Sequence, residues 1–177
     1  SSYLILCYTL IARGANALAE TPPSEAPHLA QNAHFFVELG LDLLTTALRR
    51  SRFDIHDEET VSKLLPLVKA VGETLYARNA PVVERGLRAV AALARCPLPN
   101  LDETLPVMQK QMLLLLRHAG GIHSAMAQTT LRSLSVVLRE GRAKAPPARQ
   151  LTELLNLVSS ELDAPDAQTS VFALLRA

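Results

Sequence analysis

Seven basic side chains gather in two stretches of the sequence, and their chemistry suits phosphate binding. Residues 81–100 hold three arginines and one acidic residue, and residues 121–147 hold three arginines, one lysine and one acidic residue. Arginine can make bidentate contacts with phosphate or carboxylate oxygens. The candidates for binding RNA or a protein partner are Arg85, Arg88, Arg95, Arg132, Arg139, Arg142 and Lys144. The alternative for the same residues is a solvated face with local ion pairs.

Catalytic and metal-binding patterns are absent from the sequence. No two of the five histidines stand at i,i+4 ligand spacing, and there is no CxxC motif, so we expect no zinc site. Cys96 precedes a proline and is expected to pack rather than to act as a nucleophile. Asp57, Glu58 and Glu59 suit the start of a helix better than acid–base catalysis. We therefore predict a protein that is not an enzyme and takes no cofactor and no small-molecule substrate.

The composition indicates long helices. Hydrophobic residues make up 49% of the 177 residues, but aromatics only 4%, and tryptophan is absent. Leucine and alanine, which favour helices most, dominate the apolar residues, and no stretch alternates with period two. We predict an all-α protein that is long enough to bury a sizeable core. The net charge of +1 excludes a polycation as well as an acidic tail.

The two cysteines and the residues at either end indicate which cellular compartment to expect and whether the chain is a segment. Cys7 and Cys96 do not make a disulfide framework, which favours a reducing intracellular compartment. No apolar run approaches the ~20 residues of a membrane span, so no membrane partner is expected. The first twelve residues lack the basic region of a signal sequence, and the last eight stop in mid-pattern. We expect a segment of a longer protein, which would self-associate when expressed alone.

The stretch 81–106 predicts a helix, a corner and the start of another helix. Val83, Leu87, Val90, Ala91 and Ala94 recur at helical spacing. The prolines in 96–99 should stop the first helix, because proline lacks an amide donor. Asn100 and Glu103 then resemble a capping box. Two helices joined by so short a corner should fold back on each other.

The same signals, which are apolar residues at helical spacing and prolines at helix boundaries, predict helices along the rest of the chain. We expect them at 2–18, 34–51, 57–78, 101–119, 122–140, 149–162 and 165–177, with an exposed proline-rich loop at 19–29. The expected apolar face of the first comprises Leu4, Leu6, Tyr8, Ile11 and Leu18. That of the second comprises Phe36, Leu39, Leu43, Leu44 and Leu48. The expected faces of the helices at 57–78, 101–119 and 122–140 comprise Val61, Leu64, Leu65, Val68, Val71 and Leu75, then Leu105, Met108, Met112, Leu115 and Leu116, and then Met126, Leu131, Leu134, Val137 and Leu138.

These helices predict a repeat. Pro66 and Pro106 are expected at the same place in their helices, about 40 residues apart, and the second helices align at 86–90, 130–134 and 170–174. Helix pairs with a period of roughly 40 to 47 residues are typical of HEAT and armadillo repeats. We predict a HEAT/armadillo-like α-solenoid of antiparallel helix hairpins. Its parts are a divergent pair (1–56), two repeats (57–95 and 101–140), a basic linker (141–147) and a truncated repeat (148–177).

Three stretches carry a more specific resemblance. They are HFFVELGLDLLTTALRRSRFD (34–54), LRAVAALARCPLPNL (87–101) and SELDAPDAQTSVFALLRA (160–177). Together they resemble the down-regulated-in-metastasis family, the very large HEAT-repeat, U-three small-nucleolar-RNA-associated subunit of the small-subunit processome. The resemblance covers most of the chain from residue 34 onward. It implies a non-catalytic nucleolar scaffold in ribosome biogenesis and rRNA processing. The implied partners are processome proteins, pre-ribosomal RNA and the U-three small nucleolar RNA.

Two alternatives remain for a helical repeat of this kind. An importin-like transport adaptor also binds cargo with stacked helices, but the absence of tryptophan removes the regular Trp/Asn positions of such a surface. A regulatory HEAT scaffold of an enzyme complex is the other alternative, and nothing in the residues separates it from the first interpretation.

Overall fold

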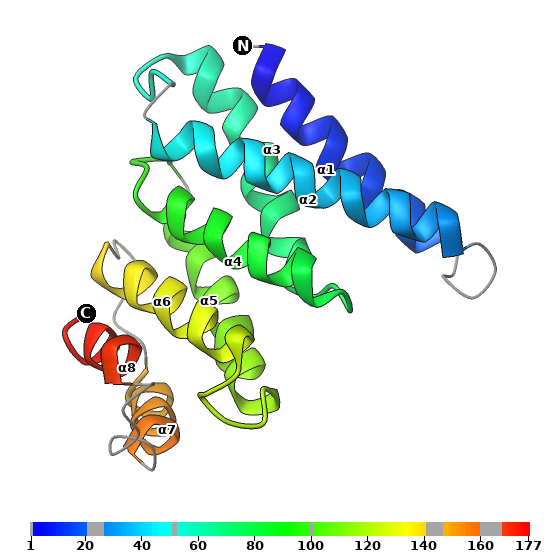
Figure 1. Ribbon diagram of the computed structural model, residues 1–177. Coiled ribbons are helices and arrows are strands. Elements are labelled where there is room, and N and C mark those ends of the chain that lie inside the picture. The colour runs from blue at the N-terminus through cyan, green and yellow to red at the C-terminus, as the bar shows by residue number, and fades with distance from the viewer. Residues whose placement is uncertain (1, 21–26, 51–52, 100, 141–146, 160–167) are drawn as a thin grey trace. The chain divides into compact units, whose positions relative to one another are not determined.

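The computed structural model describes residues 2–20, 27–50, 53–99, 101–140, 147–159 and 168–177, and Figure 1 shows helices along these ranges. In the described ranges the chain is all-helical and holds no strand, which confirms the predicted class. Its helices are α1 (Ser2–Glu20), α2 (Pro27–Arg49), α3 (Glu58–Thr74), α4 (Ala80–Ala94), α5 (Leu101–His118), α6 (Ala125–Arg139), α7 (Ala148–Ser159) and α8 (Gln168–Leu175). The predicted cap Asn100 and most of the linker 141–147 lie outside the described residues.

Several helix boundaries differ from the predictions. The helix α2 begins at Pro27, so both ends of the expected loop at 19–29 are helical instead. Proline suits the first helical position, where its missing N–H would have no partner anyway. The helix α3 ends at Thr74 rather than at residue 78, because Leu75, Tyr76 and Ala77 form a tight turn with N–H bonds three residues back. The helix α6 begins at Ala125, after the Ser124 side chain accepts the Ala127 N–H at 3.1 Å.

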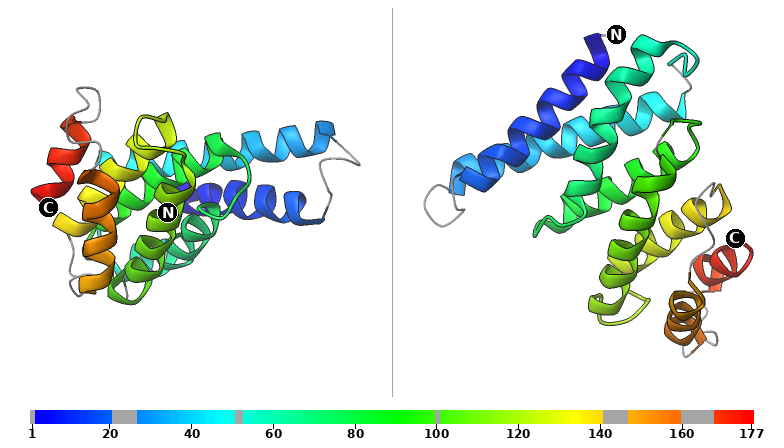
Figure 2. Two further views of the ribbon diagram at one scale, coloured as in Figure 1. Left: turned by 90° about the horizontal axis from the view of Figure 1, so that it is seen from below. Right: turned by 180° about the vertical axis from the view of Figure 1, so that it is seen from behind.

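The helices form two compact units, residues 1–98 and 99–177. In the first unit, α1 and α2 run antiparallel, α1 packs against α3, and α2 packs against α4, which pairs with α3 (Figure 2). In the second unit, α6 packs against both α5 and α8. An ion pair between Arg117 and Glu153 joins α5 to α7. The contacts therefore join successive helices in the pairs α1–α2, α3–α4 and α5–α6, and they also join helices two apart, as in α1–α3, α2–α4 and α6–α8.

The buried faces of α1 and α2 combine small residues with only some of the bulky ones. The side of α1 that is buried carries Leu4, Cys7, Ile11 and Gly14, whereas Leu6 and Tyr8 are exposed. On α2, Phe36 and Leu39 are likewise exposed. The predicted faces were right for Leu4, Ile11, Leu44 and Leu48 and wrong for Leu6, Tyr8, Phe36 and Leu39. The buried positions of α2 are Ala30, Ala33, Val37, Gly40, Leu41, Leu44, Thr45, Ala47 and Leu48.

Two glycines explain that choice of face. An added Cβ on Gly14 would lie 2.8 Å from the Ala33 carbonyl oxygen. An added Cβ on Gly40 would lie 2.8 Å from Ile11 Cγ1. Both distances are shorter than van der Waals contact, so the two backbones approach where only glycine fits.

From α3 onward the predicted faces are largely confirmed. Leu87 and Leu131 are fully buried, as expected, and so is Val171 in α8. The buried sides also include Leu64, Val68, Val71, Val83, Val90, Leu105, Met108, Met112, Leu116, Leu134 and Val137. Six other predicted face residues are only half-buried, namely Val61, Leu65, Ala91, Leu115, Met126 and Leu138.

The two helix prolines do not occupy equivalent places. Pro66 lies further into α3 than Pro106 lies into α5, by about one helical turn, so the predicted equivalence was wrong. The alignment of the second helices by Leu87, Leu131 and Val171 does not depend on these prolines.

Candidate binding site

Arg85 ties two helices together instead of pointing freely to solvent. Its Nε donates a hydrogen bond to Asp42 Oδ2 at 2.9 Å, and its Nη1 lies 3.0 Å from Glu38 Oε2, both on α2. The bond to Asp42 and the nearby carboxylates raise the pKa of the guanidinium above its usual range. Arg85 thus stabilises the contact between α4 and α2, as the ion-pair alternative supposes.

The other two candidates on α4 are more accessible. Arg88 is half-exposed, and its nearest acidic group is Glu84 Oε2 at 4.0 Å, one turn earlier. Arg95 is exposed and forms the C-cap of α4, with its N–H bonded to the Leu93 carbonyl. A cation at this end of a helix is favoured by the helix dipole.

The candidates of the second unit contact their own neighbours. Arg132 Nε donates to Ser170 Oγ of α8 at 3.3 Å, and the Ser170 hydroxyl donates to the side chain of Gln128. Arg139 Nη2 lies 3.2 Å from Glu140. Arg142 and Lys144 lie outside the described residues. RNA binding by these side chains stays a prediction.

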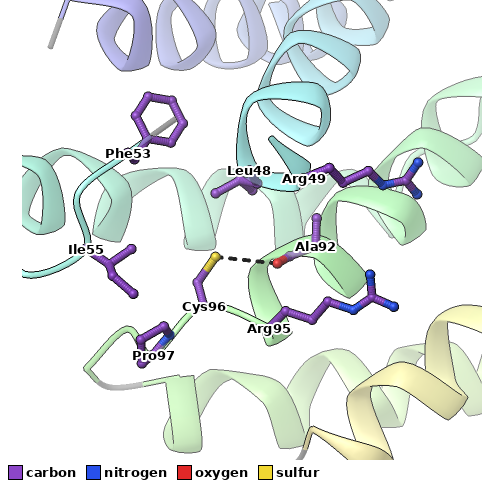
Figure 3. A pocket seen from close by; sticks show the side chains of 8 residues that line it. All are labelled: Leu48, Arg49, Phe53, Ile55, Ala92, Arg95, Cys96 and Pro97. Atoms are coloured by element: carbon purple, nitrogen blue, oxygen red, sulfur yellow. Dashed lines mark hydrogen bonds between the residues drawn. The ribbon is translucent and has the colours of Figure 1, made fainter. Parts of the chain in front are cut away.

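Arg95 lines a pocket in the first unit together with a second arginine, Arg49 (Figure 3). The pocket, of about 570 Å³, lies where α2 and α4 both end, and Arg49 and Arg95 line it from these two helices. The rest of its lining is Leu48, Phe53, Ile55, Ala92, Cys96 and Pro97, which we call the apolar floor. Among the described lining residues, none is acidic. We call this feature the arginine-rimmed pocket.

Local sequence explains how the pocket forms. The corner that begins at Cys96-Pro97 ends α4, and the turn at Phe53 and Ile55 follows α2, so both chain reversals meet at the same end of the unit. Cys96 Sγ lies 3.5 Å from the Ala92 carbonyl oxygen, and burial raises the pKa of its thiol. A raised thiol pKa disfavours the reactive thiolate, which fits the predicted packing role.

Arg49 is the residue that the sequence interpretation missed. The run Arg49-Arg50 suggested only a helix end with favourable charge. Nothing in the sequence links residue 49 to residue 95, because their proximity depends on α2 packing beside α4. The sequence does place one arginine at the end of α2 and another at the end of α4. This shared position is the signal that could have identified Arg49.

Metal-binding clusters and membrane-spanning helices are not found in the described residues. Among the described residues, His, Cys, Asp and Glu form no group of three that could hold a metal ion. No helix in the described ranges combines the length and hydropathy that crossing a membrane requires. A scan of the chain against protein-family models found no match.

Proposed function

We propose that this chain is a non-catalytic, HEAT/armadillo-like scaffold that acts by offering its helix surfaces to protein partners. The observation that carries the proposal is the shared environment of Leu87, Leu131 and Val171, each fully buried in its helix. In each case the preceding residue, Gly86, Thr130 or Ser170, is small and also buried. The same pattern, a small buried residue followed by a fully buried aliphatic residue, recurs in α4, α6 and α8, as expected of repeated hairpins.

The contacts between helices support the same proposal. Helix α2 packs against α4 and helix α6 packs against α8, so second helices lie beside second helices within each unit. Stacking of this kind buries apolar stripes that a single hairpin would leave exposed. Several acidic and basic side chains form ion pairs between or along helices, and such pairs suit a scaffold.

The cellular role we propose is ribosome biogenesis, in the nucleolus, as the resemblance to the down-regulated-in-metastasis family implies. In that role the partners would be processome proteins, with pre-ribosomal RNA and the U-three small nucleolar RNA in the same particle. RNA contact by exposed arginines such as Arg88 and Arg95 is part of this proposal. If ~4 cations met phosphates, the logarithm of the binding constant would fall with log salt at a slope of about −3 to −4.

Purification of the tagged protein from its own cells tests this role. We expect processome proteins and pre-ribosomal RNA to co-purify, and the protein to lie in the nucleolus. Recovery of nuclear-import cargo would instead support an importin-like adaptor, and recovery of one enzyme with its catalytic subunit would support a regulatory scaffold. Either outcome, without pre-ribosomal RNA, would refute the proposed role.

A further inference from the structure

We propose that another pocket in the first unit binds a bulky apolar side chain of a protein partner, together with a carbonyl oxygen of the partner's backbone. The inference rests on the proposed function only in assuming that the chain binds proteins. The pocket has a volume of about 440 Å³, within the range of about 300–1,000 Å³ that is usual for ligand sites. It is lined by α1, α2, α3, the turn after α3, and the start of α4. We call it the histidine pocket, because His34 lines it.

Small apolar side chains make up most of the wall of the histidine pocket. Among its described lining residues, seven of twelve are alanine, leucine or valine. Ala15 and Ala19 come from α1 and Ala70 comes from α3, and each contributes only a methyl group. An apolar side chain larger than alanine would fill this space and lose its contact with water, which favours binding. The wall therefore indicates an occupant with a bulky apolar group.

His34 supplies a hydrogen-bond donor whose chemistry is fixed by its neighbour. The Asn79 side chain caps α4, and its Oδ1 accepts the Val82 N–H at 3.0 Å. The other end of the same amide, Nδ2, therefore lies 3.3 Å from His34 Nδ1. An amide nitrogen can only donate, so His34 Nδ1 accepts and the ring hydrogen is on Nε2. This Nε2–H is left for an occupant, and a backbone carbonyl oxygen is a fitting acceptor.

The charged residues of the lining favour an uncharged group over an ion. Glu73 and Arg78 both line the pocket, both are exposed to solvent, and their opposite charges balance. A phosphate backbone would meet one carboxylate for each arginine here, so the pocket suits RNA poorly. An apolar side chain flanked by peptide groups carries no charge and offers the carbonyl that His34 needs. It matches the lining in charge as well as in hydrogen bonding.

Ligand-observed saturation-transfer NMR on the full 177-residue chain can test the proposal, because the method tolerates self-association. The probe is N-acetyl-L-phenylalaninamide, which carries one bulky apolar side chain between two peptide carbonyls. N-acetyl-L-alaninamide is the matched control, since it keeps the carbonyls and lacks the bulky group. We expect the phenylalanine probe to bind with a Kd on the order of 1 mM, and the alanine control to bind at least about tenfold more weakly.

A pocket-filling variant shows whether the probe occupies the histidine pocket. Ala70→Leu should weaken binding of the phenylalanine probe at least about tenfold, because the leucine side chain would take up the space. Ala17→Leu is the matched control, since Ala17 is exposed on α1 and is not among the lining residues. Circular dichroism checks that each variant is folded. Undiminished binding in A70L would place the probe elsewhere on the chain and overturn the proposal.

Two changes at His34 test the hydrogen bond. His34→Phe keeps a ring but removes the donor, and it should weaken binding of the phenylalanine probe about three- to tenfold. His34→Gln has an amide nitrogen that can donate from a position similar to Nε2, so it should weaken binding less. Equal affinity of H34F, H34Q and the parent chain would show that no carbonyl is bound there, which contradicts the proposal.

Charged probes separate a protein segment from a small charged ligand. Phenylacetate and phenethylamine carry the same ring with a negative or a positive group. We expect both to bind more weakly than the phenylalanine probe, because the charges of the lining balance. If either bound more tightly, the occupant would be a charged small molecule and the inference would be wrong. Failure of processome proteins to co-purify would leave these results untouched, so the two proposals fail separately.

Discussion

At the scale of single residues, the arginines of α4 divide into two kinds. Arg85 is held by two carboxylates of α2, whereas Arg95 lines an open pocket together with Arg49. Arg85, Arg88 and Arg95 are the same residue type with the same charge, and they differ only in the side chains around them. Partly exposed ion pairs such as those of Arg85 contribute up to about 1 kcal/mol each, so this arginine serves the fold modestly.

Leu87 and Leu131 offer the most direct test of the packing. Both side chains are fully buried, with 0% solvent accessibility. Changing either to alanine should lower the free energy of unfolding by about 2–5 kcal/mol, because a buried cavity remains after the leucine is removed. Urea unfolding followed by circular dichroism measures the change. Val107→Ala on α5 is the control, since Val107 is 57% exposed and should lose little. A loss below about half a kcal/mol at Leu87 would contradict the packing described.

At the scale of elements, the helix starts are set by side-chain caps. Asp57, Asn79 and Ser124 each adopt extended backbone and accept a backbone N–H three residues later, at the starts of α3, α4 and α6. Each cap satisfies a donor that the first turn of a helix would otherwise leave unpaired.

Asp57 gives one of these caps a pH dependence. Hydrogen bonds from the Thr60 hydroxyl and the Thr60 N–H lower the pKa of the Asp57 carboxyl. Its stabilising effect is therefore present above the unfolded pKa, about 4, and is lost as the pH falls through the lower folded value. We expect thermal unfolding of D57N, which keeps a capping side chain, to change less than that of the parent chain between pH 5 and pH 2. An identical decline in both proteins would show that this carboxylate does not contribute.

The sequence predicted the buried faces of α3 to α6 better than those of α1 and α2. Leucine, valine and methionine at helical spacing identify a buried side when bulky residues fill it, as at Leu87, Val90 and Met112. In the first hairpin the buried side is built partly from Ala33, Gly40 and Gly14, which carry no strong hydropathy signal. The arginine-rimmed pocket could not be predicted either, because it depends on which two helix ends come together.

At the scale of the whole molecule, the outward side of α2 is unusually apolar. Leu29, Phe36 and Leu39 are 60%, 47% and 38% exposed, and their spacing puts them on one side of the helix. Contiguous exposed apolar surface of this kind tends to be covered by another protein surface. The bulky residues that the sequence assigned to the core are thus available for contact.

Self-association of the 177-residue chain follows from that surface. We expect sedimentation velocity to show species larger than the monomer as concentration rises, and Phe36→Glu to shift them toward the monomer, because a charge would have to be buried in the contact. Val107→Glu is the matched control, since it adds the same charge at a similarly exposed apolar position on α5. A monomer at high concentration in the parent chain would refute the prediction.

The two glycines between α1 and α2 have a consequence for the spacing of these helices. Gly14 lies against Ala33 and Val37, and Gly40 lies against Ile11, so the two close contacts are about one helical turn apart on each helix. Any side chain at either glycine would have to push α1 and α2 apart, because an added Cβ would overlap atoms of the opposite helix. The distance between the two helices is therefore set by the absence of two side chains.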